Sequence, residues 1–104
     1  MSAESVVVAA LHVRPGAEEA FARFEQQALA IVREQGGRLE RAVRVPRAAD
    51  APYEIHVLAF PSQSAFDAYR QDPRLAALAP LRENAVERTV LWTGSDVSIE
   101  YSAK

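Results

Sequence analysis

Apolar and polar positions recur with two different periods along the chain, and these periods divide it into extended and helical segments. Residues 6–13, VVVAALHV, are apolar on both faces, a pattern typical of a central strand. In residues 17–35 the apolar positions recur at steps of three and four, as in an amphipathic helix: Ala20 or Phe21, Phe24, Ala28 and Ile31. The Gly36-Gly37 pair then predicts the end of this helix.

The following segments predict a pair of strands. Residues 38–46 alternate apolar and polar side chains, as a half-buried strand does. Residues 53–60, YEIHVLAF, predict a third strand that ends at Pro61. The stretch between them, residues 46–52, is rich in proline and alanine, and we expect it to be a loop within the same domain.

Two capping signals follow the third strand. Ser62 is suited to cap a helix over residues 62–71, and Asp72 followed by Pro73 is suited to begin another helix. The second helical region is therefore expected in two pieces. Residues 85–94 predict a fourth strand. The role of the short tail after it is left open, an edge strand in this sheet or in that of a partner chain being one option.

The order strand, helix, strand, strand, helix, strand is the ferredoxin-like βαββαβ motif. It predicts an α+β fold in which a four-stranded antiparallel sheet carries its helices on one face. The length of 104 residues fits a single domain, 1–104, with residues 94–104 as its C-terminal tail.

Helices on one face leave the other face of the sheet uncovered. We expect the fully apolar half of each strand under the helices, because a buried polar atom without a partner costs about 1–3 kcal/mol. These halves are Val7, Ala9, Leu11 and Val13, and Tyr53, Ile55, Val57 and Ala59. The outward halves would be Val6, Val8, Ala10 and His12, and Glu54, His56, Leu58 and Phe60. Their apolar members predict a homodimer packed sheet to sheet.

Composition narrows the function classes. Twelve basic and fourteen acidic residues leave a net charge of −2 without a basic block, so we expect no nucleic-acid partner. There is no cysteine, which excludes thiol chemistry and disulfides. No apolar run approaches the roughly 20 residues of a membrane span, so a cytoplasmic protein is expected. Phosphate-binding loops and nucleophile elbows are also absent from the sequence, and no cofactor is expected.

Two histidines are candidates for chemistry. With the face assignment above, His12 and His56 lie on one face of neighbouring strands, and Glu54 lies close to them. Two imidazoles and a carboxylate would hold a divalent metal, or would serve as base and orienting group in proton transfer. The spacing matches no known metal signature, so no metal site is predicted. A structural pair at the dimer interface is the favoured alternative.

Arg82 breaks an apolar helical stripe. It follows Leu75, Leu78 and Ala79 on the expected inner face of the last helix. A buried guanidinium there would need a carboxylate, either from the protein or from an anionic ligand. Pro80 opposes this orientation, because it disfavours helical geometry just before it and would turn Arg82 into solvent.

Trp92 and Tyr69, with Phe66 and Phe60, are candidates for the wall of a pocket that takes a flat organic ligand. The same aromatic residues are equally expected in an ordinary core. The sequence alone does not distinguish these two roles.

Several local motifs resemble a known family. A strand ending in FPS, an aromatic at Tyr69, the stretch DPRLAALAPLR and a last strand closing at Gly94 resemble domain-of-unknown-function family 1330, over nearly the whole chain. The resemblance implies a dimeric α+β barrel, in which two ferredoxin-like subunits pack their sheets together and ligands bind between sheet and helices or inside the barrel. Here the last strand ends in LWTG, without the acidic residue that the family has before this glycine.

These observations lead to one main hypothesis and two alternatives. The protein is expected to bind or transform a small acidic or aromatic molecule, with His12, His56 and Arg82 as catalytic candidates and Glu54, Tyr69 and Trp92 as ligand contacts. One alternative is a non-catalytic dimeric interaction domain. The other is a cofactor-independent monooxygenase, which the resemblance suggests because relatives of that kind use Asn, Trp and Arg around an apolar pocket.

Overall fold

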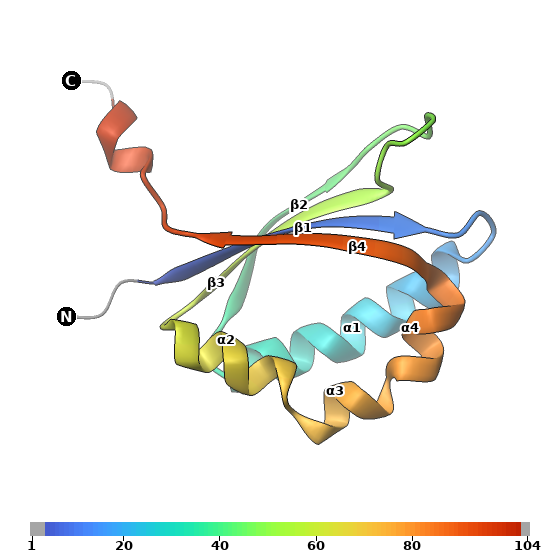
Figure 1. The fold of residues 1–104 in the computed structure, drawn as a ribbon, viewed down its shortest axis with the longest axis horizontal. Helices are drawn as coiled ribbons and strands as arrows, with labels where there is room; N and C mark the ends of the chain where they lie inside the picture. Colours follow the sequence, from blue (N-terminus) through green and yellow to red (C-terminus); the bar gives the residue numbers. More distant parts are fainter. Residues whose placement is uncertain (1–3, 103–104) are drawn as a thin grey trace.

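The structure is a computed structural model that describes residues 4–102, and its chain forms a sheet with a layer of helices beneath it (Figure 1). The elements in chain order are β1 (Ser5–Val13), α1 (Glu18–Glu34), β2 (Arg38–Arg44), β3 (Glu54–Phe60), α2 (Gln63–Arg70), α3 (Pro73–Ala77), α4 (Ala79–Ala85), β4 (Val86–Gly94) and η1 (Ser98–Tyr101).

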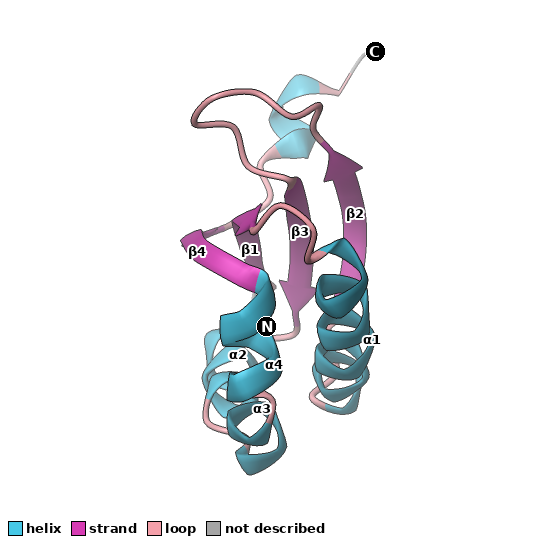
Figure 2. Ribbon diagram, turned by 90° about the vertical axis from the view of Figure 1, so that its right-hand side faces the viewer, coloured by secondary structure: helices cyan, strands magenta, loops and turns pink. Residues whose placement is uncertain are grey.

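The four strands form one antiparallel sheet in the order β2-β3-β1-β4, so that β1 lies in its centre as predicted. The helices α1 to α4 all lie on one side of this sheet (Figure 2). The ferredoxin-like prediction is therefore confirmed, and the predicted element bounds agree with the structure within two residues.

Both predicted caps are present. The Ser62 hydroxyl accepts a hydrogen bond from the Ala65 backbone N–H at 3.1 Å, and the Asp72 carboxylate accepts one from the Arg74 N–H at 2.8 Å. Each bond satisfies one of the free N–H groups at a helix start. The region divides a second time at Leu78, where α3 ends and α4 begins with Pro80 in its first turn. Proline is tolerated there because that N–H has no helical partner.

The pairing register corrects the predicted faces of β3. Val7, Ala9 and Leu11 of β1 lie opposite Leu58, His56 and Glu54, and directly opposed residues share a face of the sheet. Glu54, His56, Leu58 and Phe60 therefore face the helices, and Ile55, Val57 and Ala59 face away from them. The prediction was wrong because it assumed that polar side chains on this strand would have no partner under the helices.

The core consists of two clusters between the sheet and the helices. One is centred on Leu11, Val13 and Phe21, and the other on Val7, Phe60 and Phe66. Gly37, between α1 and β2, lies close to the second cluster, and a Cβ placed there would come within 2.8 Å of the Phe60 ring. Glycine is thus required at this position by close packing, whereas Gly36 has a φ of +82° and ends the helix.

The other face of the sheet is open and carries apolar side chains together with the polar His12, Arg41 and Arg88. It presents Trp92, whose exposed fraction is 56%, and Val43, together with the partly exposed Val6, Val8, Ala10, Ile55, Val57 and Val90. We call this surface the open face. An apolar outer face was predicted, although β3 contributes to it through residues other than those expected.

Up to residue 102, where the described part of the chain ends, the C-terminal tail adds no strand to this sheet. Residues Ser98–Tyr101 form a single 3₁₀ turn that projects past the end of β4 (Figure 1), so they do not form the edge strand that was one option for the tail. Ile99 and Tyr101 on this turn are among the most exposed large hydrophobic side chains. Within residues 4–102, no helix has the length and apolar character needed to cross a membrane.

Candidate functional site

A cavity of about 330 Å³ lies between the sheet and the helices. Every strand except β2 and each of the helices α1 to α4 contributes to it. Its apolar walls are formed by Ala9, Leu11, Phe24, Leu58, Phe66, Leu75 and Leu91, and its polar residues are Glu25, His56, Tyr69, Arg70, Arg82 and Thr89. A mostly apolar cavity with a few convergent polar groups is the usual form of a small-molecule site.

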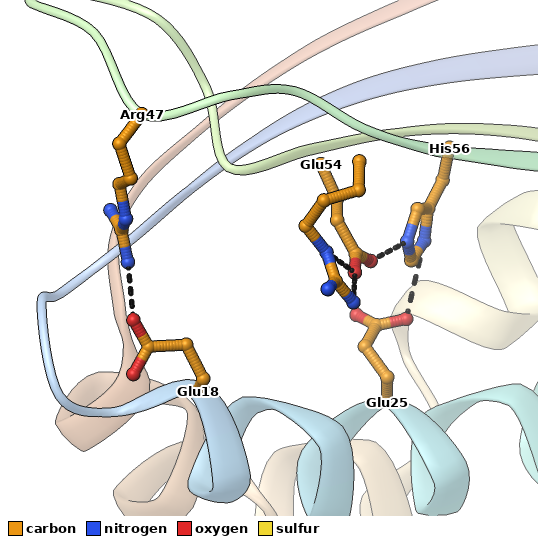
Figure 3. Close-up of polar contacts among 6 residues, drawn as sticks. Glu18, Glu25, Arg47, Glu54 and His56 are labelled. Carbon is orange, nitrogen blue, oxygen red and sulfur yellow. Dashed lines mark hydrogen bonds and ion pairs between the residues drawn. The ribbon is translucent and has the colours of Figure 1, made fainter.

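His56 lies at the inner wall with a carboxylate at each ring nitrogen (Figure 3). Its Nε2 is 2.8 Å from Oε1 of Glu54, and its Nδ1 is 3.4 Å from Oε2 of Glu25, while only 5% of the side chain is exposed. Only the imidazolium has two N–H donors, so this arrangement is matched by the protonated ring.

The surroundings of His56 act on its pKa in opposite directions. Burial lowers the pKa of His56, but the contacts with Glu25 and Glu54 outweigh burial and raise this pKa above the ordinary value of 6.5. The two carboxylates thus favour the charged form of the buried ring.

Glu54 connects the buried histidine to the molecular surface. It accepts hydrogen bonds from Nε and Nη2 of Arg44 on β2, and the Arg44 side chain is mostly exposed. Arg44, Glu54, His56 and Glu25 therefore form a chain of alternating charges that runs from solvent to the cavity. A separate ion pair between Arg47 and Glu18, at 2.7 Å, joins the β2–β3 loop to the start of α1 (Figure 3).

Glu25 is the functional candidate that sequence reasoning missed. It lies on α1 between Phe21 and Leu29, each four residues away, and its side chain is only 16% exposed. Residues four apart share a helix face, so its place on the buried stripe was visible in the sequence. The same signal drew attention to Arg82.

Arg82 lines the cavity although the residue as a whole is exposed, and Pro80 does not end the helix before it. Because α4 starts anew at Ala79, Pro80 occupies its first turn and Arg82 follows within continuous helix. The Nη2 of Arg82 donates a hydrogen bond to the Thr89 hydroxyl on β4 at 2.9 Å. Among residues 4–102, no carboxylate forms an ion pair with Arg82.

Tyr69 also lines the cavity, where α2 places it beside the rings of Phe60 and Phe66. Burial raises the pKa of Tyr69 to about 12; the charge of Glu25 adds to this effect and that of Arg82 opposes it. The side chain is therefore a neutral phenol at any physiological pH, and it lies within electrostatic reach of both charged groups.

The structure separates His12 and Trp92 from this cavity. His12 alternates with the core residues of β1 and lies on the face opposite to His56, with its Nε2 3.3 Å from Nη2 of Arg88. Trp92 is paired with Val8 on the open face. The predicted proximity of His12 to His56 was wrong, because the two side chains project from opposite faces of the sheet. Among the described residues, no group of side chains is suited to hold a metal ion.

Neither a family model nor a curated protein matches the sequence. Solved structures do match: a protein of unknown function from Rhodopseudomonas palustris has a TM-score of 0.80 at 16% identity, with 93% of this chain and 85% of that chain covered. A dimeric ferredoxin-like protein of unknown function from Bacteroides fragilis has a TM-score of 0.67 at 8% identity, covering 89% and 96%.

A third structure, from Nitrosomonas europaea, is provisionally assigned as an antibiotic biosynthesis monooxygenase. It has a TM-score of 0.72 at 15% identity and covers 93% of both chains. At these identities the likeness shows the fold alone. The chain is thus a ferredoxin-like α+β protein with a cavity between sheet and helices, and its resemblance to family 1330 stays a prediction.

Proposed function

We propose that the protein binds a small organic acid with an aromatic or other apolar body in the cavity between sheet and helices. The observation that carries the proposal is Arg82, a guanidinium that lines a mostly apolar cavity and has no carboxylate partner among residues 4–102. A planar guanidinium in such a place favours a carboxylate, which it can bind through two parallel hydrogen bonds.

The experiment compares two ligands of similar shape and different charge. Titration of the protein with 2-naphthoate, followed by calorimetry, should give measurable binding, whereas neutral 2-naphthylmethanol should bind at least about tenfold more weakly, since hydrogen bonds to charged groups contribute roughly 1.5–3 kcal/mol. Equal affinity for both compounds would contradict the role of Arg82.

Arg82→Met should weaken 2-naphthoate binding by roughly tenfold or more, and it should leave binding of 2-naphthylmethanol nearly unchanged. Arg33→Met is the matched control, because Arg33 is an exposed residue in the last turn of α1 and does not line the cavity. The assignment fails if both variants bind 2-naphthoate as the unchanged protein does.

We also propose that a second copy of the chain covers the open face, sheet against sheet. The exposed apolar side chains of this face support a partner, since soluble monomers rarely expose contiguous apolar surface. The Bacteroides fragilis protein with the same fold is described as dimeric, and the resemblance to family 1330 implies the same arrangement. A dimer without any ligand in the cavity would instead favour a non-catalytic interaction domain.

The monooxygenase alternative has less support in the site. The pocket implied by that resemblance uses Asn and Trp with Arg, but neither Asn84 nor Trp92 lines the described cavity. Of the Asn, Trp and Arg residues that the resemblance implies, only Arg82 lines the cavity. We therefore do not extend the proposal to oxygen chemistry.

A further inference from the structure

The helices contribute four polar residues to the cavity; Arg70 of α2 lies over the Phe66 ring, and the other three come from three different helices. Glu25 comes from α1, Tyr69 from α2 and Arg82 from α4, and the walls between them are largely apolar. The three groups are chemically distinct: a carboxylate, a neutral phenol and a permanent cation. An acceptor of protons thus shares one small cavity with two donors of hydrogen bonds.

The carboxylate of Glu25 is positioned by a contact with His56. Its Oε2 contacts the buried His56 ring, and among the described residues this is the only ion pair that Glu25 forms. A carboxylate has about four acceptor positions, so most of its capacity remains for a ligand in the cavity that it lines. The contact with the buried His56 ring orients this carboxylate.

The two donors suit a developing negative charge on oxygen. Because the pKa of Tyr69 is raised to about 12, its hydroxyl stays protonated and is available as a donor. Arg82 is always charged, and its fork of N–H groups accommodates two oxygens at once. Donors placed where charge develops during a reaction contribute much of enzymatic catalysis.

We infer that the cavity is a proton-transfer site for enolisable 2-oxo acids, in which Glu25 removes a proton from the carbon next to the ketone. This inference rests on the proposed function, because the ligand carboxylate is first bound by Arg82. The substrate class combines the carboxylate that Arg82 favours, an apolar body for the walls, and a carbon acid for Glu25.

The reaction is balanced without any further reactant. An oxygen of Glu25 takes the proton, the C–H electron pair becomes the carbon–carbon double bond of the enolate, and the carbonyl π pair moves to the ketone oxygen. That oxygen accepts a hydrogen bond from the Tyr69 hydroxyl. Return of the proton from Glu25 to carbon regenerates the ketone, and transfer to oxygen yields the enol.

His56 is a positioning residue in this scheme, since it contacts Glu25 and acts through it. Replacing the ring by a neutral side chain would release the Glu25 carboxylate without removing it. His56→Gln should therefore lower the rate of proton transfer at saturating ligand while it leaves the dissociation constant of the ligand unchanged. A rate equal to that of the unchanged protein, in a variant shown to be folded, would contradict this role.

Phenylpyruvate is the probe that tests the inference. In D₂O, exchange of its C3 protons, followed by proton NMR, should be faster in proportion to the concentration of the protein. Glu25→Gln should lower the protein-dependent rate by at least about a hundredfold, the usual contribution of a general base. Glu19→Gln is the matched control, because Glu19 is an exposed acid on the same helix. This variant should accelerate exchange of the C3 protons as much as the unchanged protein does.

The outcomes separate this inference from the proposed function. If phenylpyruvate and 2-naphthoate both bind but exchange is not accelerated, or Glu25→Gln is as fast as the unchanged protein, proton transfer is refuted and ligand binding stands. Binding of 2-naphthoate without binding of phenylpyruvate refutes the substrate class. If neither compound binds, the proposed function fails and the inference fails with it.

Discussion

At the scale of single residues, the site depends on charged side chains that are buried with partners. His56 was recognised in the sequence as a candidate, but its face was predicted wrongly because alternation along a strand does not say which half faces the helices. Which face His56 occupies depends on Glu25, 31 positions earlier in the chain, because the contact with this carboxylate makes burial of the ring favourable. A prediction that places every polar residue of a strand on the outer face does not take account of a partner so far away in the sequence.

The contacts of His56 predict how stability depends on pH. Its folded-state pKa is raised, so its contribution to stability is complete below the ordinary value of 6.5 and is lost as the pH rises through the folded-state pKa. The groups that face it are Glu25 from α1 and Glu54 from β3, the latter paired with Arg44 of β2.

Urea unfolding at a series of pH values measures this dependence. The free energy of unfolding should fall as the pH increases from about 6.5, and the decrease should be absent from His56→Gln. The interpretation of His56 as a stabilising imidazolium is wrong if the folded protein becomes more stable over this range, or if the variant shows the same slope.

At the scale of elements, local chemistry was sufficient for most predictions. Ser62 and Asp72 were correctly identified as caps because a cap depends only on the next two or three residues. The effect of Pro80 was not settled by sequence, because a proline either ends one helix or begins the next. The structure has the second arrangement, so Arg82 stays within α4 and lines the cavity. The conformation of the tail depends on what surrounds it, and residues Ser98–Tyr101 form a 3₁₀ turn instead of a strand.

At the scale of the whole molecule, the two faces of the sheet have different surroundings. The helices and the cavity occupy one face, and the open face carries Trp92 and a broad apolar surface. Sequence patterns predicted that one face would be open, because the βαββαβ order places both helical regions on the same side. They assigned Trp92 to the ligand pocket, since an aromatic residue in a strand suits either face.

The proposed dimer predicts a change at this single tryptophan. Trp92 is 56% exposed in one chain, so association through the open face would bury it and shift its emission to shorter wavelength. Trp92→Glu should convert the protein to a monomer in sedimentation velocity at micromolar concentration, because it places an unpaired charge in the interface. Ala30→Glu, an exposed position of α1, is the control and should leave the dimer intact. A monomeric unchanged protein would contradict the proposal.

The central claim is that a small organic acid binds between the sheet and the helices. Its most direct test is NMR mapping of backbone amide shifts during titration with 2-naphthoate. The account predicts that the largest shifts occur around Phe24, Tyr69 and Arg82, which line the cavity. Shifts confined to residues of the open face, such as Val8 and Trp92, or no shifts at all, would contradict it.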